Sequence, residues 1–374
     1  GIVLELLMEQ SEESIRAACL ALLAAAPAAA GSASLRGLAL RLLDGHTLSR
    51  EEARDLGRRL FDPDEAVELQ VLCAHLLRVR YETMDEWCGL LDAQGETLDT
   101  GRFGAPRGRD ILASAGKARL VQLAEPFDGT HRSESFAPLI ARHLQQRWGA
   151  VVVSQCGPSS GPKYGPNLLQ LALALSPDAP LAASNLDIAE AGADQPAFGW
   201  YVTQGDASGG LGRWGPIRRN VVKRPFLATA EKYLDTAGAG VLLASAFHPS
   251  FSDKMFLMAE RASAFEACVI VRRGCEGSLG LSLARPAEFV CGRRRPDGTM
   301  ERFDFAFGPA DAGVRPRAER EQQLEGLSAK DTAGKIRRFA AAGASGDAVF
   351  DDRVALTLAG LDVAMEFVAA GRRL

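Results

Sequence analysis

Three glycine-containing loops hold the residues of this sequence that could bind an anionic ligand. The loops run from Glu125 to Ser133, from Gln155 to Gly165 and from Arg272 to Ser278. Each combines glycines, hydroxyl groups and cations, and each lies ahead of or near a predicted helix. Backbone amides at a helix start, together with an adjacent cation, form an anion site. One such loop alone is best interpreted as a tight connection between a strand and a helix. Three such loops at one sheet edge make binding of an anionic ligand as good an interpretation as tight connections.

The first two loops contain seven candidates for contact with a phosphate group. Glycines allow close backbone approach, hydroxyls donate hydrogen bonds and cations neutralise charge. His131 is the better histidine candidate because Asp128 and Arg132 flank it, whereas His248 follows an apolar run and favours a structural role. The sequence has no Ser-His-Asp order, H-E-x-x-H signature or Walker loop. The candidates are Gly129, Thr130, His131, Arg132, Ser133, Ser159 and Lys163.

A second group of candidates is basic. The twelve residues from Arg213 to Arg224 contain five cations and no carboxylate, with apolar residues between them. This pattern is typical of the solvated face of a helix, and it also fits a stripe that follows phosphates. The predicted acceptor-side or basic-groove residues are Arg218, Arg219, Lys223, Arg224, Arg272 and Arg273.

The elements that position these loops differ between the two ends of the chain. Up to about residue 95 the pattern is helical, and the spacing of Ser49 to Glu52 and of Thr83 to Glu86 predicts capping boxes. From about residue 118, short apolar strands alternate with helical segments, which predicts βαβ units and a mainly parallel sheet. Ligands bind beyond the carboxyl ends of such strands. The predicted strands cover 119–123, 151–153, 241–247 and 268–271.

The sequence therefore predicts an α/β protein in which an N-terminal helical bundle domain is packed on a larger α/β domain. The predicted boundaries are 1–97 for the helical domain, 98–117 for a glycine-containing linker and 118–374 for the α/β domain. The stretch from Gln204 to Gly215, with five glycines, and the charged stretch from Gly308 to Asp331 predict solvated surface segments.

The bulk composition argues against several classes of protein. Of 374 residues, 47% are apolar and the net charge is −4, which is ordinary for a globular protein and gives no global polycation for nucleic acid. No apolar run is long enough to span a membrane, so no membrane association is expected. The seven cysteines form no C-x-x-C pair, which disfavours a zinc cage and favours a reducing cytoplasm.

Several motifs resemble those of anthranilate phosphoribosyltransferases, which are glycosyltransferases. The segments from Leu43 to Ala53 and from Glu82 to Glu86 resemble the opening helices of that family and its G-E-T-x-E-E segment. The stretch from Ile217 to Pro225 resembles the basic R-R-E-L-G-x-R-T stretch near the acceptor pocket. The resemblance implies a cleft between the two domains and a homodimer made through the helical part. It also implies that the chain returns to the helical domain over the segment of about 213–235.

The chain departs from the family where phosphoribosyl pyrophosphate and magnesium are held. The family motif G-T-G-G-D corresponds to Gly129 to Ser133, and K-H-G-N-R corresponds to Ser154 to Pro158, which keeps only the glycine. The D-E pair that holds magnesium aligns near Ser278 and Leu279, neither of which ligates a hard cation. Glu276 is the one carboxylate nearby and so a weak metal candidate. Magnesium binding is therefore not expected in the family's manner.

The better match is a divergent, "anthranilate phosphoribosyltransferase-like" branch, which shares the motifs from Asp128 to Ser133 and from Glu276 to Ser278. Some of its members resemble dimeric nucleic-acid binders that lack transferase activity. Beside a structural or regulatory protein that binds a small phosphorylated metabolite, two functions follow from the resemblance. One is phosphoribosyl transfer to an unknown acceptor beside Arg218 and Arg219, with Arg132 and Lys163 in place of magnesium. The alternative is a non-catalytic dimer that binds nucleic acid along the basic groove.

Overall fold

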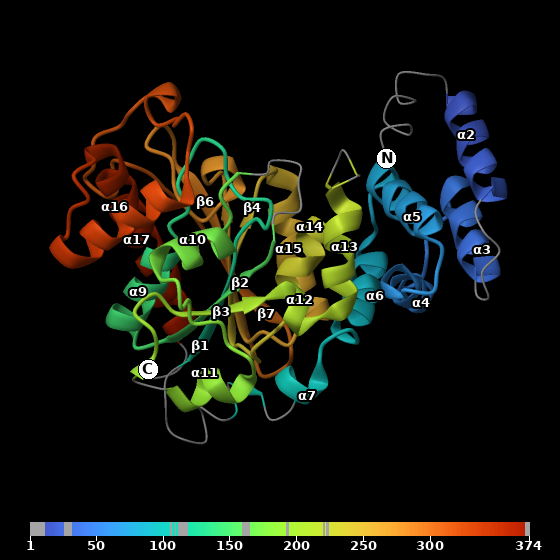
Figure 1. Cartoon of the computed structure of the whole chain (residues 1–374), viewed down its shortest axis with the longest axis horizontal. Helices are drawn as coiled ribbons and strands as arrows, with labels where there is room; N and C mark the ends of the chain where they lie inside the picture. Colours follow the sequence, from blue (N-terminus) through green and yellow to red (C-terminus); the bar gives the residue numbers. More distant parts are fainter. Residues whose placement is uncertain are drawn as a thin grey trace. The chain divides into compact units, whose positions relative to one another are not determined.

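A computed structural model describes residues 12–25, 32–104, 107–108, 110, 119–158, 165–191, 194–219, 221 and 224–370 (Figure 1). The described chain forms two compact units. The first contains the residues up to Leu98 together with Ser208–Leu234, and the second contains the residues from Asp99 to Ala207 and from Asp235 onward. Half of the predicted linker, including 111–117, lies outside the described residues.

The first unit is helical. Both predicted capping boxes are confirmed at the starts of its helices α4 and α6. The Ser49 amide donates to Glu52 Oε2 at 2.9 Å, and the Thr83 amide donates to Glu86 Oε2 at 2.8 Å. Each carboxylate satisfies an amide that the first helical turn leaves without an intrahelical partner. The helices are α2 (Glu12–Ala25), α3 (Ser32–Leu43), α4 (Arg50–Phe61), α5 (Val67–Arg80), α6 (Met84–Gly95), α13 (Gly209–Arg219) and α14 (Leu227–Ala230), followed by the 3₁₀ turn η3 (Glu231–Tyr233).

The second unit is built on a seven-stranded sheet with the order β3-β2-β1-β4-β5-β6-β7. The first five strands in that order are parallel, and β6 and β7 are antiparallel additions at one side. The predicted α/β class with a mainly parallel sheet is confirmed, and all four predicted strands are present. The strands are β1 (Leu120–Ala124), β2 (Val151–Cys156), β3 (Trp200–Thr203), β4 (Val241–Ala246), β5 (Ala267–Arg272), β6 (Ala287–Arg294) and β7 (Met300–Phe307).

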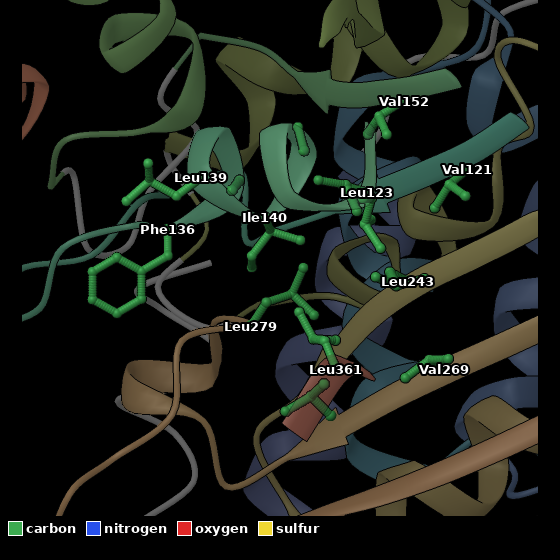
Figure 2. Packing of buried hydrophobic residues seen from close by; sticks show 14 of the residues in the cluster. Val121, Leu123, Phe136, Leu139, Ile140, Val152, Leu243, Val269, Leu279 and Leu361 are labelled. Atoms are coloured by element: carbon green, nitrogen blue, oxygen red, sulfur yellow. The ribbon is translucent and has the colours of Figure 1, made fainter. Parts of the chain in front are cut away.

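Helices of the second unit bury one face of this sheet. Alternate residues of a strand point to the same face, so Val121 and Leu123 of β1 both enter the core. There they lie with Ile140 of α9 and Leu361 of α17 (Figure 2). This packing fixes where the strands end and therefore where their loops begin. The helices are α7 (Thr100–Phe103), α9 (Ala137–Trp148), α10 (Leu168–Leu175), α11 (Asn185–Ala191), α12 (Gln204–Ala207), α15 (Pro249–Ala262), α16 (Ala329–Ala342) and α17 (Ala348–Ala369), with 3₁₀ turns η4 (Cys275–Gly277) and η5 (Glu319–Glu321).

The prediction of a surface loop from Gln204 to Gly215 was wrong, because this stretch forms α12 and the first part of α13. Trp214 is fully buried in the first unit, and its indole Nε1 donates to the Leu60 carbonyl at 2.7 Å. Arg213 adds hydrogen bonds to the Asp62 carbonyl and the Gln70 side chain at 2.9 and 2.8 Å. These contacts hold the helix despite the low helix propensity of glycine.

No helix within the described ranges combines the length and the apolar character that a membrane span requires.

Candidate functional site

The loop after β1 is held in one conformation by a close backbone contact. Gly129 has φ +74°, and a Cβ atom there would lie 2.4 Å from the Gly165 carbonyl oxygen and 2.5 Å from that of Pro166. The Thr130 amide donates to the Pro166 carbonyl at 3.3 Å, and the Thr130 hydroxyl donates to the Ser133 carbonyl at 2.5 Å. Only glycine fits this position, since a side chain would meet both left-handed backbone strain and a steric clash.

The donors of this loop converge on one carboxylate. Glu276, in the η4 turn after β5, accepts hydrogen bonds through both of its side-chain oxygens. Its Oε1 accepts from the His131 amide at 3.0 Å. Its Oε2 accepts from the Arg132 amide and from the Ser133 hydroxyl, both at 2.8 Å. Three of the seven predicted residues, His131, Arg132 and Ser133, therefore donate to one anionic group, which is a side chain of the protein itself.

Basic side chains occur in the same loop and in the loop after β5. The His131 and Arg132 side chains are exposed. Within the described residues, no group accepts a hydrogen bond from the Arg132 guanidinium. Arg273 is 46% exposed and lies 3.3 Å from Glu288, which also forms an ion pair with Arg272. Among the described residues of these two loops, Arg132 is thus available to an incoming anion, whereas Arg273 is partly neutralised.

Solved structures of similar fold are anthranilate phosphoribosyltransferases. The enzyme from Thermus thermophilus has a TM-score of 0.62 and 17% identity, over 89% of this chain and 95% of that one. A variant of the Saccharomyces cerevisiae enzyme with Mg bound has a TM-score of 0.62 and 14% identity, over 90% and 89% of the two chains. The yeast enzyme in complex with PRPP and Mg has a TM-score of 0.58 and 11% identity, over 90% and 98%.

The fold is that of an anthranilate phosphoribosyltransferase. No protein-family model matches the sequence. No curated protein matches it either. At these identities the likeness establishes the fold, and function must be argued from the site itself.

In this phosphoribosyltransferase fold, the positions where the family's magnesium acids would align have structural roles. Leu279 is fully buried and belongs to the hydrophobic core (Figure 2). Its amide donates to Glu125 Oε1 at 3.0 Å. The Ser278 hydroxyl donates to the Cys275 carbonyl at 2.8 Å and accepts from the Gly280 amide at 3.2 Å. Neither residue is placed to face a ligand.

The remaining carboxylate does not fit a magnesium site. Both oxygens of Glu276 face N–H and O–H donors, and such donors repel a cation. Within the described ranges, no group of three or more His, Cys, Asp or Glu side chains could hold a metal ion. The described groups around Glu276 are hydrogen-bond donors, which suit an anion better than a metal ion.

The other predicted residues fall into three groups. Ser159, Lys163 and Lys223 lie outside the described residues. Arg218 is 4% exposed and forms a buried ion pair with Glu231, so its guanidinium serves the interior of the first unit. The other three cations are divided between the two units. Arg219, which is exposed, and Arg224, which is half-buried, belong to the first unit, and the half-buried Arg272 belongs to the second.

An exposed aromatic side chain near the η4 turn was not predicted. Phe247 follows β4 and is 55% exposed. A Cβ atom on Gly277 would lie 3.3 Å from Phe247, so the ring stands beside the turn that carries Glu276. The His248 ring packs against it at 4.9 Å in an edge arrangement. The available sequence signal was a large aromatic residue directly after a buried strand and before a proline, at the edge where ligands bind.

Burial disfavours a nucleophilic role for Cys156 and Cys275 near this edge. Burial raises the pKa of the Cys156 thiol to about 12 and also raises the pKa of Cys275. A thiol must lose its proton to act as a nucleophile, and a raised pKa makes this harder for both residues. Their Sγ atoms point to backbone carbonyls, that of Val202 for Cys156 and that of Leu281 for Cys275.

Proposed function

We propose that the protein binds a phosphorylated ligand at the carboxyl edge of the sheet in its second unit, in the manner of a phosphoribosyltransferase whose magnesium motif has been lost. One observation carries the proposal. The amides of His131 and Arg132 and the hydroxyl of Ser133 converge within 3.0 Å on the two oxygens of one carboxylate. A phosphoryl group presents oxygens with similar spacing and more charge, and such donors suit it.

The proposed ligand class is a sugar phosphate or pyrophosphate such as phosphoribosyl pyrophosphate. Arg132 would neutralise the charge that a metal ion neutralises in a magnesium-dependent site, so binding should not need magnesium. Phe247 offers a flat apolar surface to an aromatic or heterocyclic group beside the phosphate. Transfer chemistry has less support than binding, because a pyrophosphate leaving group needs dense charge compensation as it departs.

The nucleic-acid alternative has weaker support in the described residues. Arg218 is buried with Glu231, and Arg272 is paired with Glu288, so two of the groove cations have intramolecular partners. Phosphate-backbone binding depends on several cations that can contact solvent. Nucleic-acid binding is therefore an outcome to be tested beside the main proposal.

Calorimetric titration with phosphoribosyl pyrophosphate, with and without magnesium, tests the proposed function. Saturable binding that magnesium does not strengthen is expected. Arg132→Ala should weaken it about tenfold, the equivalent of one charge-assisted hydrogen bond. Arg261→Ala removes an equally exposed cation from the last turn of α15 and should leave the affinity unchanged. Absence of binding by the wild type at millimolar ligand, with salt-sensitive binding of a short oligonucleotide, would replace this proposal by the nucleic-acid alternative.

The helical unit is the proposed contact of a homodimer. Several large apolar side chains on it are exposed, and burial of such side chains is what an interface between two copies would provide. Replacing the 57%-exposed Val79 by aspartate should shift the species from dimer to monomer in sedimentation at micromolar concentration. A wild-type protein that sediments as a monomer would contradict this assignment. The exposed residues are Leu20, Leu22, Leu40, Val67, Val79 and Tyr81.

A further inference from the structure

We propose that Glu276 is a built-in competitor for the phosphate site, so that a ligand anion binds by displacing the Glu276 carboxylate from the His131 and Arg132 amides and the Ser133 hydroxyl. This inference rests on the proposed function and adds its regulation. The carboxylate occupies the donors when no ligand is bound and leaves them when a more highly charged anion arrives. The site would then select phosphate and pyrophosphate over monocarboxylates, since a monocarboxylate offers nothing that Glu276 does not already provide.

The donors are held in place by contacts that do not involve Glu276. Gly129 packs against the backbone at Gly165 and Pro166, and the Thr130 hydroxyl closes the turn on the Ser133 carbonyl. The Arg132 carbonyl accepts from the Leu324 amide at 3.0 Å. Because these bonds persist when the carboxylate leaves, the donors keep their directions. A preorganised set of donors costs little further ordering when an anion binds.

The side chain that fills this site extends from a strained turn. Glu276 has φ +52° and Arg273 has φ +65°, and they are two of the three non-glycine residues with positive φ in the described chain. Positive φ is unfavourable for such residues and persists where the surrounding structure imposes it. The turn is imposed by the Cys275 amide bonding to the Gly280 carbonyl at 2.7 Å. The backbone can therefore stay fixed while the half-buried Glu276 side chain rotates away.

Exposed charge explains why a phosphate would win this competition. The Arg132 guanidinium has no hydrogen-bond acceptor within the described residues, and Arg273 is 46% exposed. The hydrogen bonds that Glu276 accepts from the β1 loop come from two amides and a hydroxyl. A phosphoryl group has a further oxygen and a further charge, which can reach the Arg132 guanidinium as well.

The test compares inorganic pyrophosphate binding to the wild type, Glu276→Gln and Glu190→Gln by calorimetry at constant ionic strength. Glu276→Gln should bind pyrophosphate about tenfold tighter or more. The ligand no longer has to displace one charge-assisted hydrogen bond, and one such bond corresponds to a factor of about 10 to 100 in affinity. Glu190 is exposed on α11, and its variant makes the same change of net charge without touching the loops. It should bind like the wild type.

A second variant guards against local unfolding. Glu276→Gly accepts φ +52° without strain and removes the carboxylate entirely. Pyrophosphate should raise its melting temperature more than that of the wild type, and acetate should restore part of the stability that the substitution removes. Both responses report on the emptied donor site and do not require tight binding by the wild type.

The outcomes separate the two proposals. Tighter binding by Glu276→Gln supports the competitor role, whether or not the wild type binds. Equal or weaker binding by both Glu276 variants, with clear binding by the wild type, leaves the phosphate site standing and makes Glu276 a structural link between loops. Absence of binding by all variants at millimolar pyrophosphate overturns both proposals.

Discussion

The two edges of the sheet in the second unit differ in which charged side chains form hydrogen bonds with the backbone. At the carboxyl edge, carboxylates accept from backbone amides, with Glu276 on His131 and Arg132 and Glu125 on Leu279. At the amino edge, arginines donate to backbone carbonyls. Arg119 donates to the Val368 carbonyl at 2.9 Å, and Arg294 donates to the carbonyls of Ala259, Glu260, Ser263, Phe265 and Gly298.

At the amino edge, the pattern follows from a helix end that lies there. α15 begins just after the carboxyl end of β4 and ends before the amino end of β5, and the last turns of a helix leave carbonyls without partners. Arg294 satisfies those carbonyls at the end of α15.

A cavity of about 570 Å³ lies at the amino edge and is lined by Arg119, Arg293, Arg294 and Arg295 together with Glu266 and Glu301. It is rich in arginine, yet Arg294 is engaged by carbonyls and Arg293 by Glu301. The number of cations is therefore a poor indicator of a ligand site. Cations that have no hydrogen-bond acceptor within the protein are a better indicator.

The largest expected effect tests the internal support of the carboxyl edge. Arg353 of α17 pairs with Glu134 of the β1 loop at 2.9 Å, and both side chains are almost fully buried. Arg353→Leu should cost about 3–5 kcal/mol in the free energy of unfolding, because it leaves a buried carboxylate with one partner fewer. Urea denaturation measures this. Arg302→Leu, which breaks an exposed network with Asp253 and Asp304, should cost under about 1 kcal/mol. Equal losses in the two variants would contradict the assignment.

The next effect tests whether the β1 loop is held by its glycine. Gly129→Ala should cost about 2–4 kcal/mol, since left-handed strain adds to a clash with two carbonyls, and it should also weaken phosphate binding. Gly298 has φ +88° but open space around it. Gly298→Ala should therefore cost only the strain, about 1 kcal/mol. Thermal denaturation of both variants separates the two contributions, and a smaller loss for Gly129→Ala would show that the loop rearranges freely.

A smaller effect is expected at the amino edge. Arg294→Met keeps the aliphatic stem but removes the hydrogen bonds to the carbonyls at the end of α15, and it should cost about 2 kcal/mol. Arg295 is exposed, and Arg295→Met should change the free energy of unfolding by less than about 0.5 kcal/mol. If the two variants were equally stable, the arginines of this edge would be available to ligands and the contrast between the edges would fail.

Much of the fold was predictable because local pattern and tertiary structure agree there. The four predicted strands are short apolar runs, and the capping boxes follow from Ser49 and Thr83 with their glutamates three residues later. The strands β3, β6 and β7 were not predicted. In β7 the buried Met300 begins a strand whose remaining side chains are largely exposed, so the apolar signal is weak. The pattern from Arg213 to Arg224 indicated a helix, but the glycine-rich start of α13 at Gly209 was missed. The burial of Trp214, a tertiary contact, outweighs the local effect of those glycines.

The site was predictable only in part. Within the loop from Gly129 to Ser133, the donors of His131, Arg132 and Ser133 converge on the Glu276 carboxylate, and strand-end position was the signal that singled out this loop. The role of Glu276 was not predictable, because it depends on a contact between residues 143 to 145 positions apart. A sequence shows that a carboxylate lies near a strand end but not which donors the topology brings opposite it. Glu276 was interpreted as a weak metal ligand for that reason.

The smallest expected effect is a pH dependence at the amino edge. The Arg293 guanidinium donates a hydrogen bond to the Glu301 carboxylate at 2.6 Å and lowers the pKa of that group below its usual value of 4.5. A carboxyl with a lowered pKa in the folded state stabilises the fold above the pKa of the unfolded chain, and this contribution is lost as the pH falls through the folded pKa. Glu301→Gln should therefore have a lower melting temperature than the wild type at pH 7. This difference in melting temperature should narrow below about pH 4.5, the usual pKa of the group.

Glu190→Gln, on the exposed face of α11, should show no comparable change with pH. A gap for Glu301→Gln that stays constant down to about pH 3 would mean that the pair contributes through packing and not through charge. The amino edge would then not depend on the ionisation of its acids.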